Sequence, residues 1–197
     1  MSEPLTKIAL ASRSPRRKQL LEALGLDVEV IPSAYDEATA TNDGSPGEAA
    51  LRHALGKARM AHAGGPPVLV AADTIVSLDG ELLGKPKDGR EGRAMLRRLS
   101  GREHSVFTGF VVLDRSNGQS RSGVESTLVR FLPLEPEQID AYVASGDPLD
   151  KAGSYGIQGR GALLVASING DFYAVMGLPL ARIGASLREL GYRLPAS

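Results

Sequence analysis

The sequence predicts an α/β fold in which helices flank a mixed β-sheet. Two observations indicate this class. Apolar runs typical of buried strands alternate with segments of helical periodicity, and Asn-Gly or Asp-Gly pairs join neighbouring β-type runs. The 197 residues suffice for a sizeable core, so we expect residues 1–197 to form a single domain, with room for two lobes.

Composition narrows the class of protein. Hydrophobic residues make up 42% and charged residues 23% of the chain, as in ordinary soluble proteins. Lys plus Arg (23) balance Asp plus Glu (23), without the basic excess that binding to long nucleic acid leaves. There is no membrane-spanning apolar run and no signal-peptide layout, so we expect a cytoplasmic protein that binds no membrane. The absence of cysteine excludes disulfides and thiolate chemistry.

The first half of the chain combines capped helices with apolar strands. Ser14 is the expected N-cap of the first helix, with Pro15 at its first position, and Gly25 suits its end. Ser45 and Glu48 form the capping box of the next helix. In order, we expect a strand over 8–11, a helix over 14–25, a strand over 28–32, a helix over 45–61, a buried strand over 68–72 that ends in Asp73-Thr74, and a hairpin of 75–78 with 81–83.

The second half predicts two hairpins and a long glycine-bearing segment. That segment, 147–161, is functional or disordered by its length, and Tyr155 and Ile157 favour order. In order, we expect a helix over 88–99, a hairpin of 105–113 with 123–132 through Asn117-Gly118, a helix over 135–146, the long segment, a last hairpin of 162–168 with 172–176 through Asn169-Gly170, and a helix over 179–190.

The first strand–helix junction has the features of an anion site. Arg16 and Arg17 lie in the first helical turn, where the helix dipole disfavours cations by roughly 0.3–1 kcal/mol each. Free backbone N–H groups, serines such as Ser12 and two arginines together favour phosphate binding. The alternative is that both arginines extend into solvent.

Further candidate site residues lie at the ends of apolar elements or in the loops between them. Asp73 ends a buried strand, where open α/β folds place ligands, although such a carboxylate can also cap a turn. Pro86 keeps Lys85 extended, so that it projects from a loop, as a solvated lysine also would. Lys57 suits a helix C-terminus, and Glu37 has the alternative of being a solvated loop residue.

Together these residues suit phosphate chemistry. The cations fit a multiply charged phosphate chain, and carboxylates can hold Mg²⁺, which uses one or two of them plus substrate phosphates. A metal on phosphate oxygens and a carboxylate that orients water describe phosphoanhydride hydrolysis. The amide of Gln158 can donate to and accept from a base edge. No P-loop motif is present, so the residues themselves indicate an α/β phosphate-binding enzyme whose metal dependence is open.

Five ordered motifs carry a more specific resemblance. They are Ser12-Arg13-Ser14-Pro15-Arg16-Arg17, Ala72-Asp73-Thr74, Gly84-Lys85-Pro86, Ser-Gly-Arg-Glu-His-Ser-Val-Phe-Thr-Gly at 100–109 and Asp-Lys-Ala-Gly-Ser-Tyr-Gly-Ile-Gln-Gly at 150–159. From about residue 8 to residue 190 the chain resembles the Maf family of nucleoside triphosphate pyrophosphatases. The resemblance implies an elongated fold shared with inosine triphosphate pyrophosphatases, a cleft between two lobes, a homodimer, and hydrolysis of a nucleoside triphosphate with Mg²⁺ or Mn²⁺.

The resemblance also implies roles for individual residues. Asp73 matches the proton acceptor and, with Glu37, a metal ligand. The phosphate- and metal-handling positions match Ser12, Arg16, Arg17, Glu37, Lys57 and Lys85, and the substrate-distinguishing positions match Arg16, Thr74 and Gln158. Tyr-Gly-Ile-Gln-Gly at 155–159, with Asp-Thr at 73–74, is similar to the subgroup that cleaves dTTP and UTP. The alternative function is that of a nucleotide-binding regulator of cell division or septation with little turnover.

Overall fold

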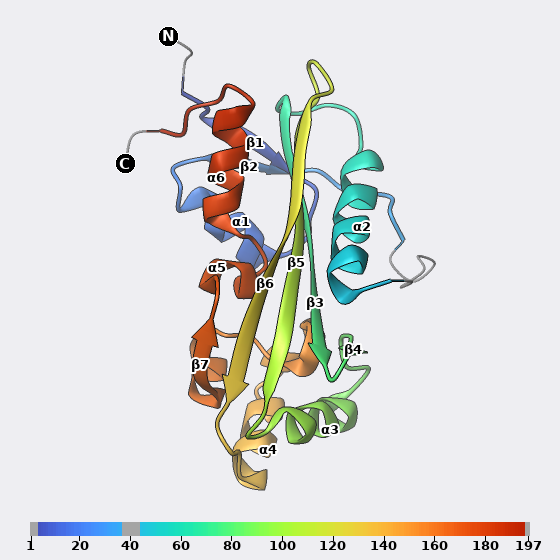
Figure 1. Cartoon of the computed structure of the whole chain (residues 1–197), viewed down its shortest axis with the longest axis vertical. Coiled ribbons are helices and arrows are strands. Elements are labelled where there is room, and N and C mark those ends of the chain that lie inside the picture. The colour runs from blue at the N-terminus through green and yellow to red at the C-terminus, as the bar shows by residue number, and fades with distance from the viewer. Residues whose placement is uncertain (1–3, 37–43, 196–197) are drawn as a thin grey trace.

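Three long strands run along most of the length of the elongated molecule (Figure 1). In the computed structural model, which describes residues 4–36 and 44–195, they are β3 (Val68–Leu78), β5 (Glu103–Asp114) and β6 (Ser120–Phe131). They are antiparallel neighbours, and β5 joins β6 through the predicted Asn117-Gly118 turn, where Gly118 has a φ of +76°. These strands form the frame on which both ends of the molecule are built.

Shorter strands complete a mixed sheet, as the sequence predicts. β1 (Lys7–Leu10) pairs in parallel with β2 (Asp27–Val30) and with β3, whereas β4 (Glu81–Leu83) and β7 (Val165–Asn169) pair antiparallel with β3 and β6. The order is β2-β1-β3-β5-β6-β7, with β4 on the far end of β3. The parallel part is therefore confined to the end of the molecule that holds β1 and β2.

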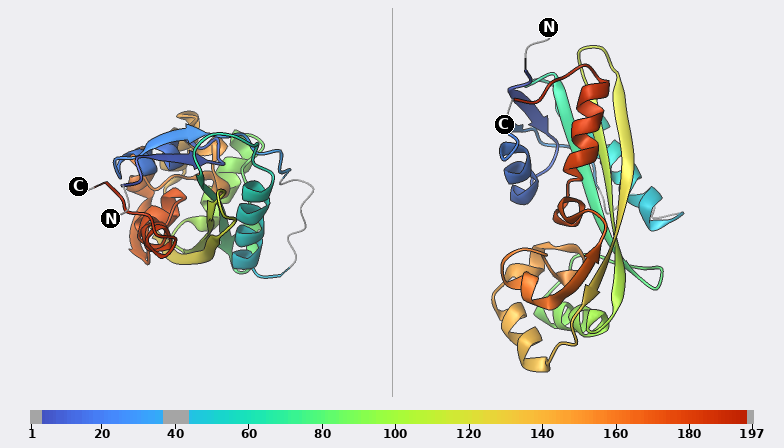
Figure 2. Two further views of the ribbon diagram at one scale, coloured as in Figure 1. Left: turned by 90° about the horizontal axis from the view of Figure 1, so that it is seen from above. Right: turned by 60° about the vertical axis from the view of Figure 1, so that its left-hand side comes forward.

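Helices cover the two faces of the sheet differently (Figures 1 and 2). α2 (Pro46–Arg59) packs on one face, against Leu69 and Val111, whose side chains alternate along their strands with those of the other face. The opposite face is covered by α1 (Pro15–Glu22), α5 (Phe172–Met176) and α6 (Leu180–Glu189), and further along by α3 (Gly89–Leu99), α4 (Pro136–Ala144) and the 3₁₀ turns η1 (Asp147–Asp150), η2 (Ala152–Ser154) and η3 (Gly159–Leu164).

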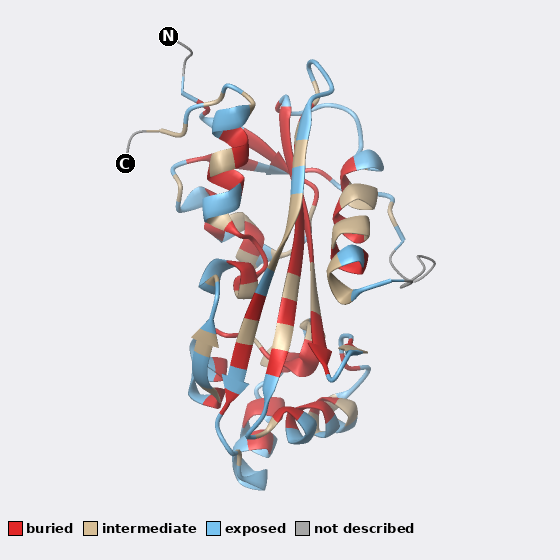
Figure 3. Ribbon diagram, in the orientation of Figure 1, coloured by how far each residue is buried: buried red, intermediate tan, exposed pale blue. Residues whose placement is uncertain are grey.

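The opposite face carries two separate hydrophobic cores. One joins α1 and α6 to the sheet through residues such as Leu21 and Ile183, and the other joins α3 and α4 through Leu96 and Ile139. Figure 3 shows the buried residues concentrated along the long strands and on the inner sides of these helices. Two cores on one continuous sheet give the molecule two lobes.

The close approach of α2 to the sheet depends on one glycine. A Cβ on Gly109 of β5 would lie 2.4 Å from the carbonyl carbon of Ala50 in α2, which is closer than atoms in contact can be. Glycine at this position therefore sets the depth at which α2 lies on the sheet. The capping box predicted for α2 is present, because Ser45 Oγ accepts from the Glu48 N–H and the Glu48 carboxylate accepts from the Ser45 N–H.

Three sequence-based expectations are wrong in detail. The strand expected to end in Asp73-Thr74 continues without a break to Leu78. The last hairpin is absent from the described structure. Its expected strand Phe172–Met176 is helix α5, because the Asp171 carboxylate accepts from the N–H groups of Tyr173 and Ala174 and so caps a helical turn. Its other strand begins only at Val165, after η3, and pairs with β6. The Ser14 side chain makes no capping bond, and its N–H instead donates to Ser12 Oγ over 3.2 Å.

Candidate active site

A gap along one edge of β3 creates the main cleft. β1 pairs with β3 as far as Val70, and β4 begins to pair with it at Val76. Among the described residues, no strand pairs with 71–75 on this edge, while β5 pairs with the other edge throughout. A cleft of about 1310 Å³ opens at this gap, between the two lobes. Asp73 therefore lies in mid-strand but just beyond the end of the parallel sheet, where ligands of α/β folds bind.

The cleft collects the sequence-predicted site residues that the structure describes. These are Ser12, Arg16, Arg17, Lys57, Asp73, Thr74, Lys85 and Gln158. Glu37, the remaining one, lies outside the described residues. Seven of the described lining side chains are Lys or Arg and three are carboxylates. Because the whole chain has a formal net charge of zero, positive charge is concentrated in this cleft, which favours a polyanionic ligand.

Asp73 and Lys57 form an ion pair within the cleft. Lys57, in the last turn of α2, donates from Nζ to Asp73 Oδ1 over 2.6 Å, and each side chain is only 12% exposed. The helix-dipole explanation of Lys57 is thus insufficient, because its side chain reaches a carboxylate at the centre of the sheet. The pair fixes Oδ1 of Asp73, and no residue in the described ranges bonds to Oδ2, which is left for another partner.

The two arginines of the first helix have different surroundings. Arg17 is buried and donates to the Gly177 carbonyl over 2.9 Å, to Ser12 Oγ over 3.0 Å and to Thr74 Oγ1 over 3.1 Å. Its side chain therefore does not extend into solvent. Arg16 lines the cleft and donates to Asp150 Oδ2 over 3.3 Å, which joins the two lobes across the cleft.

The Thr74 hydroxyl belongs to a chain of hydrogen bonds with a fixed direction. Thr108 Oγ1 donates to the Ala174 carbonyl over 2.7 Å, so it can only accept from Thr74, whose Oγ1 lies 3.0 Å away. Thr74 in turn accepts from Arg17. The single hydroxyl proton of Thr74 is used within the protein, and the hydroxyl can offer a ligand only an acceptor.

Lys151 donates its hydrogen bonds to residues of its own loop. Its Nζ donates to the carbonyl oxygen and Oδ1 of Asp147 and, over 2.7 Å, to Oδ1 of Asp150, and its side chain is only 11% exposed. Partial burial raises the pKa of Asp150, but the hydrogen bond and charge of Lys151, with the charge of Arg16, outweigh it and hold that pKa below its ordinary value. Lys151 thus orders the loop and keeps Asp150 anionic opposite Arg16.

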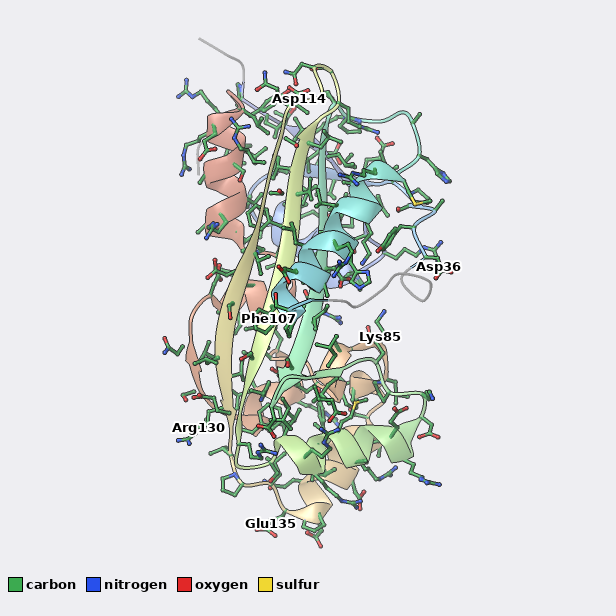
Figure 4. The ribbon with its side chains drawn as sticks, turned by 45° about the vertical axis from the view of Figure 1, so that its right-hand side comes forward. Asp36, Lys85, Phe107, Asp114, Arg130 and Glu135 are labelled. Carbon is green, nitrogen blue, oxygen red and sulfur yellow. The ribbon has the colours of Figure 1, made fainter. Side chains whose placement is uncertain are left out.

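Lys85 and Gln158 are exposed in the cleft. Figure 4 shows Lys85 projecting from the loop between β4 and α3. Gln158 directly precedes η3 in the segment 147–161, which is ordered by short 3₁₀ turns, as its apolar residues predict. Neither side chain has a hydrogen bond or ion pair to residues within 4–36 and 44–195. Lys85 therefore offers a ligand a cation, and Gln158 offers it an amide.

Sequence reasoning missed one pair of cleft residues. Tyr35 and His53 both line the cleft, with the Tyr35 hydroxyl 3.0 Å from His53 Nδ1. The Tyr35 ring lies so close to Gly56 that a Cβ there would be 2.2 Å from it. The sequence signals for this contact were Tyr35, which lies in a polar stretch, and Gly56, which lies within a helix. These two residues are 21 positions apart in the chain, so no local pattern connects them.

The described residues supply only part of a metal site in this cleft. Within the described ranges, Asp, Glu and His side chains form no group of three or more that could hold a metal ion. Asp73 supplies one carboxylate at the cleft, and Mg²⁺ characteristically combines one or two carboxylates with substrate phosphates and water. The donor set therefore fits a divalent cation that arrives with a phosphate ligand.

Fold and cleft together define an α/β protein with a cationic cleft that contains the Asp73 carboxylate. A family model described as "Maf-like protein" matches residues 7–190, and the chain belongs to this family. No helix in the described part of the chain has the length and apolar character needed to cross a membrane.

Curated relatives match nearly the whole chain. A protein of Symbiobacterium thermophilum is 50% identical over 189 residues, 95% of this chain and 96% of the relative. One of Syntrophus aciditrophicus is 46% identical over 186 residues, 94% and 90% of the two chains. One of Methanosarcina mazei is 46% identical over 189 residues, 95% of each. All three are named dTTP/UTP pyrophosphatase.

Solved structures show a weaker likeness. A HAM1 protein from Coxiella burnetii has a TM-score of 0.47 and 16% identity, with 94% of this chain and 100% of that chain covered. The Staphylococcus aureus Ham1 protein has a TM-score of 0.44 and 16% identity, with 64% and 72% covered. A likeness of this size adds nothing to the fold class, which follows from the sheet order and the placement of the helices.

Proposed function

We propose that this protein hydrolyses dTTP and UTP to the nucleoside monophosphate and pyrophosphate. The observation that carries the proposal is the cationic cleft at the gap in the sheet, with the Asp73–Lys57 pair inside it. The names of relatives that are 46% and 50% identical over nearly the whole chain support the choice of nucleotide.

In the proposed reaction, water attacks the α-phosphorus of the nucleotide. A bond forms between the water oxygen and that phosphorus, and the bond to the oxygen bridging the α- and β-phosphates breaks, so that pyrophosphate leaves. Asp73 Oδ2 accepts the proton of the water, while Lys57 holds the carboxylate in place. Arg16, Lys85 and other cleft cations stabilise the charge that develops on the phosphate oxygens.

A divalent cation, Mg²⁺ or Mn²⁺, is proposed as the cofactor. Asp73, with Glu37 from outside the described residues, would hold it together with phosphate oxygens. When bound, it would neutralise triphosphate charge in the transition state. The protein's own contribution is to place the water beside Asp73 and the triphosphate among the cations of the cleft.

The amide of Gln158 is proposed to read the base. Uracil and thymine share a carbonyl–N–H–carbonyl edge, and a primary amide can donate to one carbonyl while accepting from the N–H. Gln158 is exposed in the cleft and without a partner among the described residues. Thr74, limited to accepting, and Arg16 are the proposed further contributors to substrate choice.

Pyrophosphate release from a nucleotide panel tests the proposal. With Mg²⁺ or Mn²⁺ present, we expect dTTP and UTP to be cleaved faster than CTP, ATP, GTP or 7-methyl-GTP. Gln158→Glu should change the preference between dTTP and 7-methyl-GTP, because a carboxylate cannot donate to a carbonyl. Binding of the nucleotides without release by the wild-type protein would overturn the proposal and favour the regulator of cell division.

Two further properties belong to the same proposal. The family resemblance implies a homodimer, and the composition favours a cytoplasmic location. Sedimentation equilibrium tests the dimer directly: a mass near twice 20.7 kDa is expected, and a mass that stays at the monomer value at micromolar concentration contradicts it.

A further inference from the structure

A histidine outside the cleft is buried in an unusual way. His104, on β5, is 3% exposed and its Nε2 lies 2.8 Å from the hydroxyl oxygen of Tyr155. Its ring packs edge-on against Phe131 and Tyr155, at centroid distances of 5.1 and 5.3 Å. His104 Nδ1 is buried without a hydrogen-bond partner in the described structure. A buried unpaired polar atom costs about 1–3 kcal/mol, so an apolar residue would suit this core better unless the Nε2 bond has a use.

Tyr155 is the point at which the segment 147–161 is anchored in the core. Its ring is buried and lies 4.7 Å from that of Phe131. The next residue, Gly156, donates from its N–H to the Tyr142 hydroxyl over 3.0 Å, and that hydroxyl donates to Asp147 Oδ2 over 2.9 Å. Ile157 is buried in the core of the other lobe.

Gln158 directly follows these three fixed residues. Tyr155, Gly156 and Ile157 are each held by a different part of the protein, whereas the Gln158 side chain is exposed in the cleft. The direction in which the Gln158 amide points therefore depends on how the backbone is held immediately before it. The His104 bond fixes the first of these residues, three positions before the amide.

We propose that His104 is a positioning residue, which acts through the Tyr155 hydroxyl to hold Gln158 where it meets the nucleotide base. His104 does not itself line the cleft, so its effect on substrate choice would be indirect. The inference rests on the proposed function, because it assigns to Gln158 the reading of the base. The inference adds His104, from the motif at 100–109, to the residues that determine substrate choice.

The protonation state of His104 agrees with this role. Burial lowers the pKa of His104 to about 4, so the imidazole is neutral near pH 7. Burial also raises the pKa of Tyr155 above its ordinary value, which keeps the phenol protonated. The bond between them is therefore a neutral one, unaffected by pH changes around neutrality.

The experiment compares two substitutions at His104 with one at Tyr155. His104→Phe keeps an aromatic ring but removes the hydrogen bond, and His104→Gln keeps a side-chain nitrogen at a similar position. Tyr155→Phe removes the same bond from the other side. We expect His104→Phe and Tyr155→Phe to raise KM for UTP roughly tenfold with little change in kcat, and to reduce the preference for UTP over CTP. His104→Gln should retain most of the wild-type behaviour.

A double-mutant cycle with Gln158→Ala separates positioning from general damage. If His104 acts through Gln158, His104→Phe should add less than a twofold further loss in kcat/KM for UTP on the Gln158→Ala background. A full tenfold additional loss, or an equal fall of kcat on UTP and CTP, would overturn the inference. Tyr155→Phe serves in the same cycle if His104→Phe fails to fold.

Hydrogen exchange gives a readout that does not depend on activity. His104→Phe should speed amide exchange at least fivefold in a peptide covering 155–160, and leave peptides from the middle of β5 and β6 unchanged. Unchanged exchange in 155–160 would overturn the positioning role even if UTP is cleaved. If wild-type protein releases no pyrophosphate from any nucleotide, the proposed function fails, and the exchange result still decides whether His104 holds this segment.

Discussion

Arg17 offers a sharp test of the structure, because its neighbour Arg16 supplies a matched control. Both arginines lie in the first turn of α1, and lysine at either position keeps the positive charge. Within the described residues, Arg17 donates to oxygens of Ser12, Thr74 and Gly177, whereas Arg16 has a 3.3 Å contact with Asp150, whose side chain is 61% exposed. We predict that Arg17→Lys destabilises the fold far more than Arg16→Lys.

The magnitude follows from the number of bonds lost. A lysine at position 17 lacks the guanidinium fork and would fail to satisfy two of the three acceptors. Hydrogen bonds to charged groups contribute about 1.5–3 kcal/mol each, so we expect a loss of about 3 kcal/mol or more in the free energy of unfolding. An exposed ion pair contributes about 0.2–1 kcal/mol, which limits the effect of Arg16→Lys to about 1 kcal/mol.

Urea denaturation followed by circular dichroism measures both variants. With an m value of about 2 kcal/mol per molar urea, a loss of 3 kcal/mol lowers the midpoint by about 1.5 M, and the Arg16→Lys midpoint should move by less than about 0.5 M. Equal shifts for the two variants, or an Arg17→Lys midpoint within 0.25 M of wild type, would refute the assignment of Arg17 as the buried link between α1, β3 and α5.

Other predictions concern pH, packing and the metal ion. Because burial lowers the pKa of His104 to about 4, the unfolded chain protonates this histidine at a higher pH than the folded protein does. Its contribution to stability is complete above pH 6.5 and is lost as pH falls toward 4, by about 2 kcal/mol between pH 7.5 and pH 5. In urea titrations, the free energy of unfolding of His104→Gln should therefore fall less between pH 7.5 and pH 5 than that of the wild-type protein. An equal fall in the two proteins would contradict this prediction. Gly109→Ala should cost about 2 kcal/mol and reduce activity by moving α2 and Lys57, while Gly84→Ala, where a Cβ meets open space, should be neutral in stability. EDTA should abolish pyrophosphate release without changing the circular dichroism spectrum, and Mg²⁺ or Mn²⁺ should restore it; full activity in EDTA would exclude the metal.

Elements with strong local signals could be predicted from the sequence. The Ser45–Glu48 capping box and the Asp79-Gly80 turn each depend on residues within four positions of one another, and the structure contains both. Phe172–Met176 is a short apolar run that suits a strand or a helix equally, and the deciding contact is the cap supplied by Asp171. Its misassignment follows from that ambiguity.

The site could be predicted in composition but not in geometry. Asp73 and Thr74 interrupt an apolar run, which in sequence reads as the end of a strand. In the structure β3 continues, because β5 pairs with its other edge along the whole length. The burial of Arg17 depends on oxygens 5, 57 and 160 positions away, which no local pattern reveals. The bond between His104 and Tyr155 is equally non-local, at 51 positions.

The reaction assigned to Asp73 can be tested by following the oxygen of water. We predict that UTP hydrolysed in H₂¹⁸O yields labelled UMP and unlabelled pyrophosphate, because water attacks the α-phosphorus. Asp73→Asn, with Lys57 unchanged, should lower kcat by about 10²–10⁴-fold, as expected on loss of a general base. Label in the pyrophosphate would contradict attack at the α-phosphorus. Near wild-type turnover by Asp73→Asn would contradict the role of Asp73 as the general base.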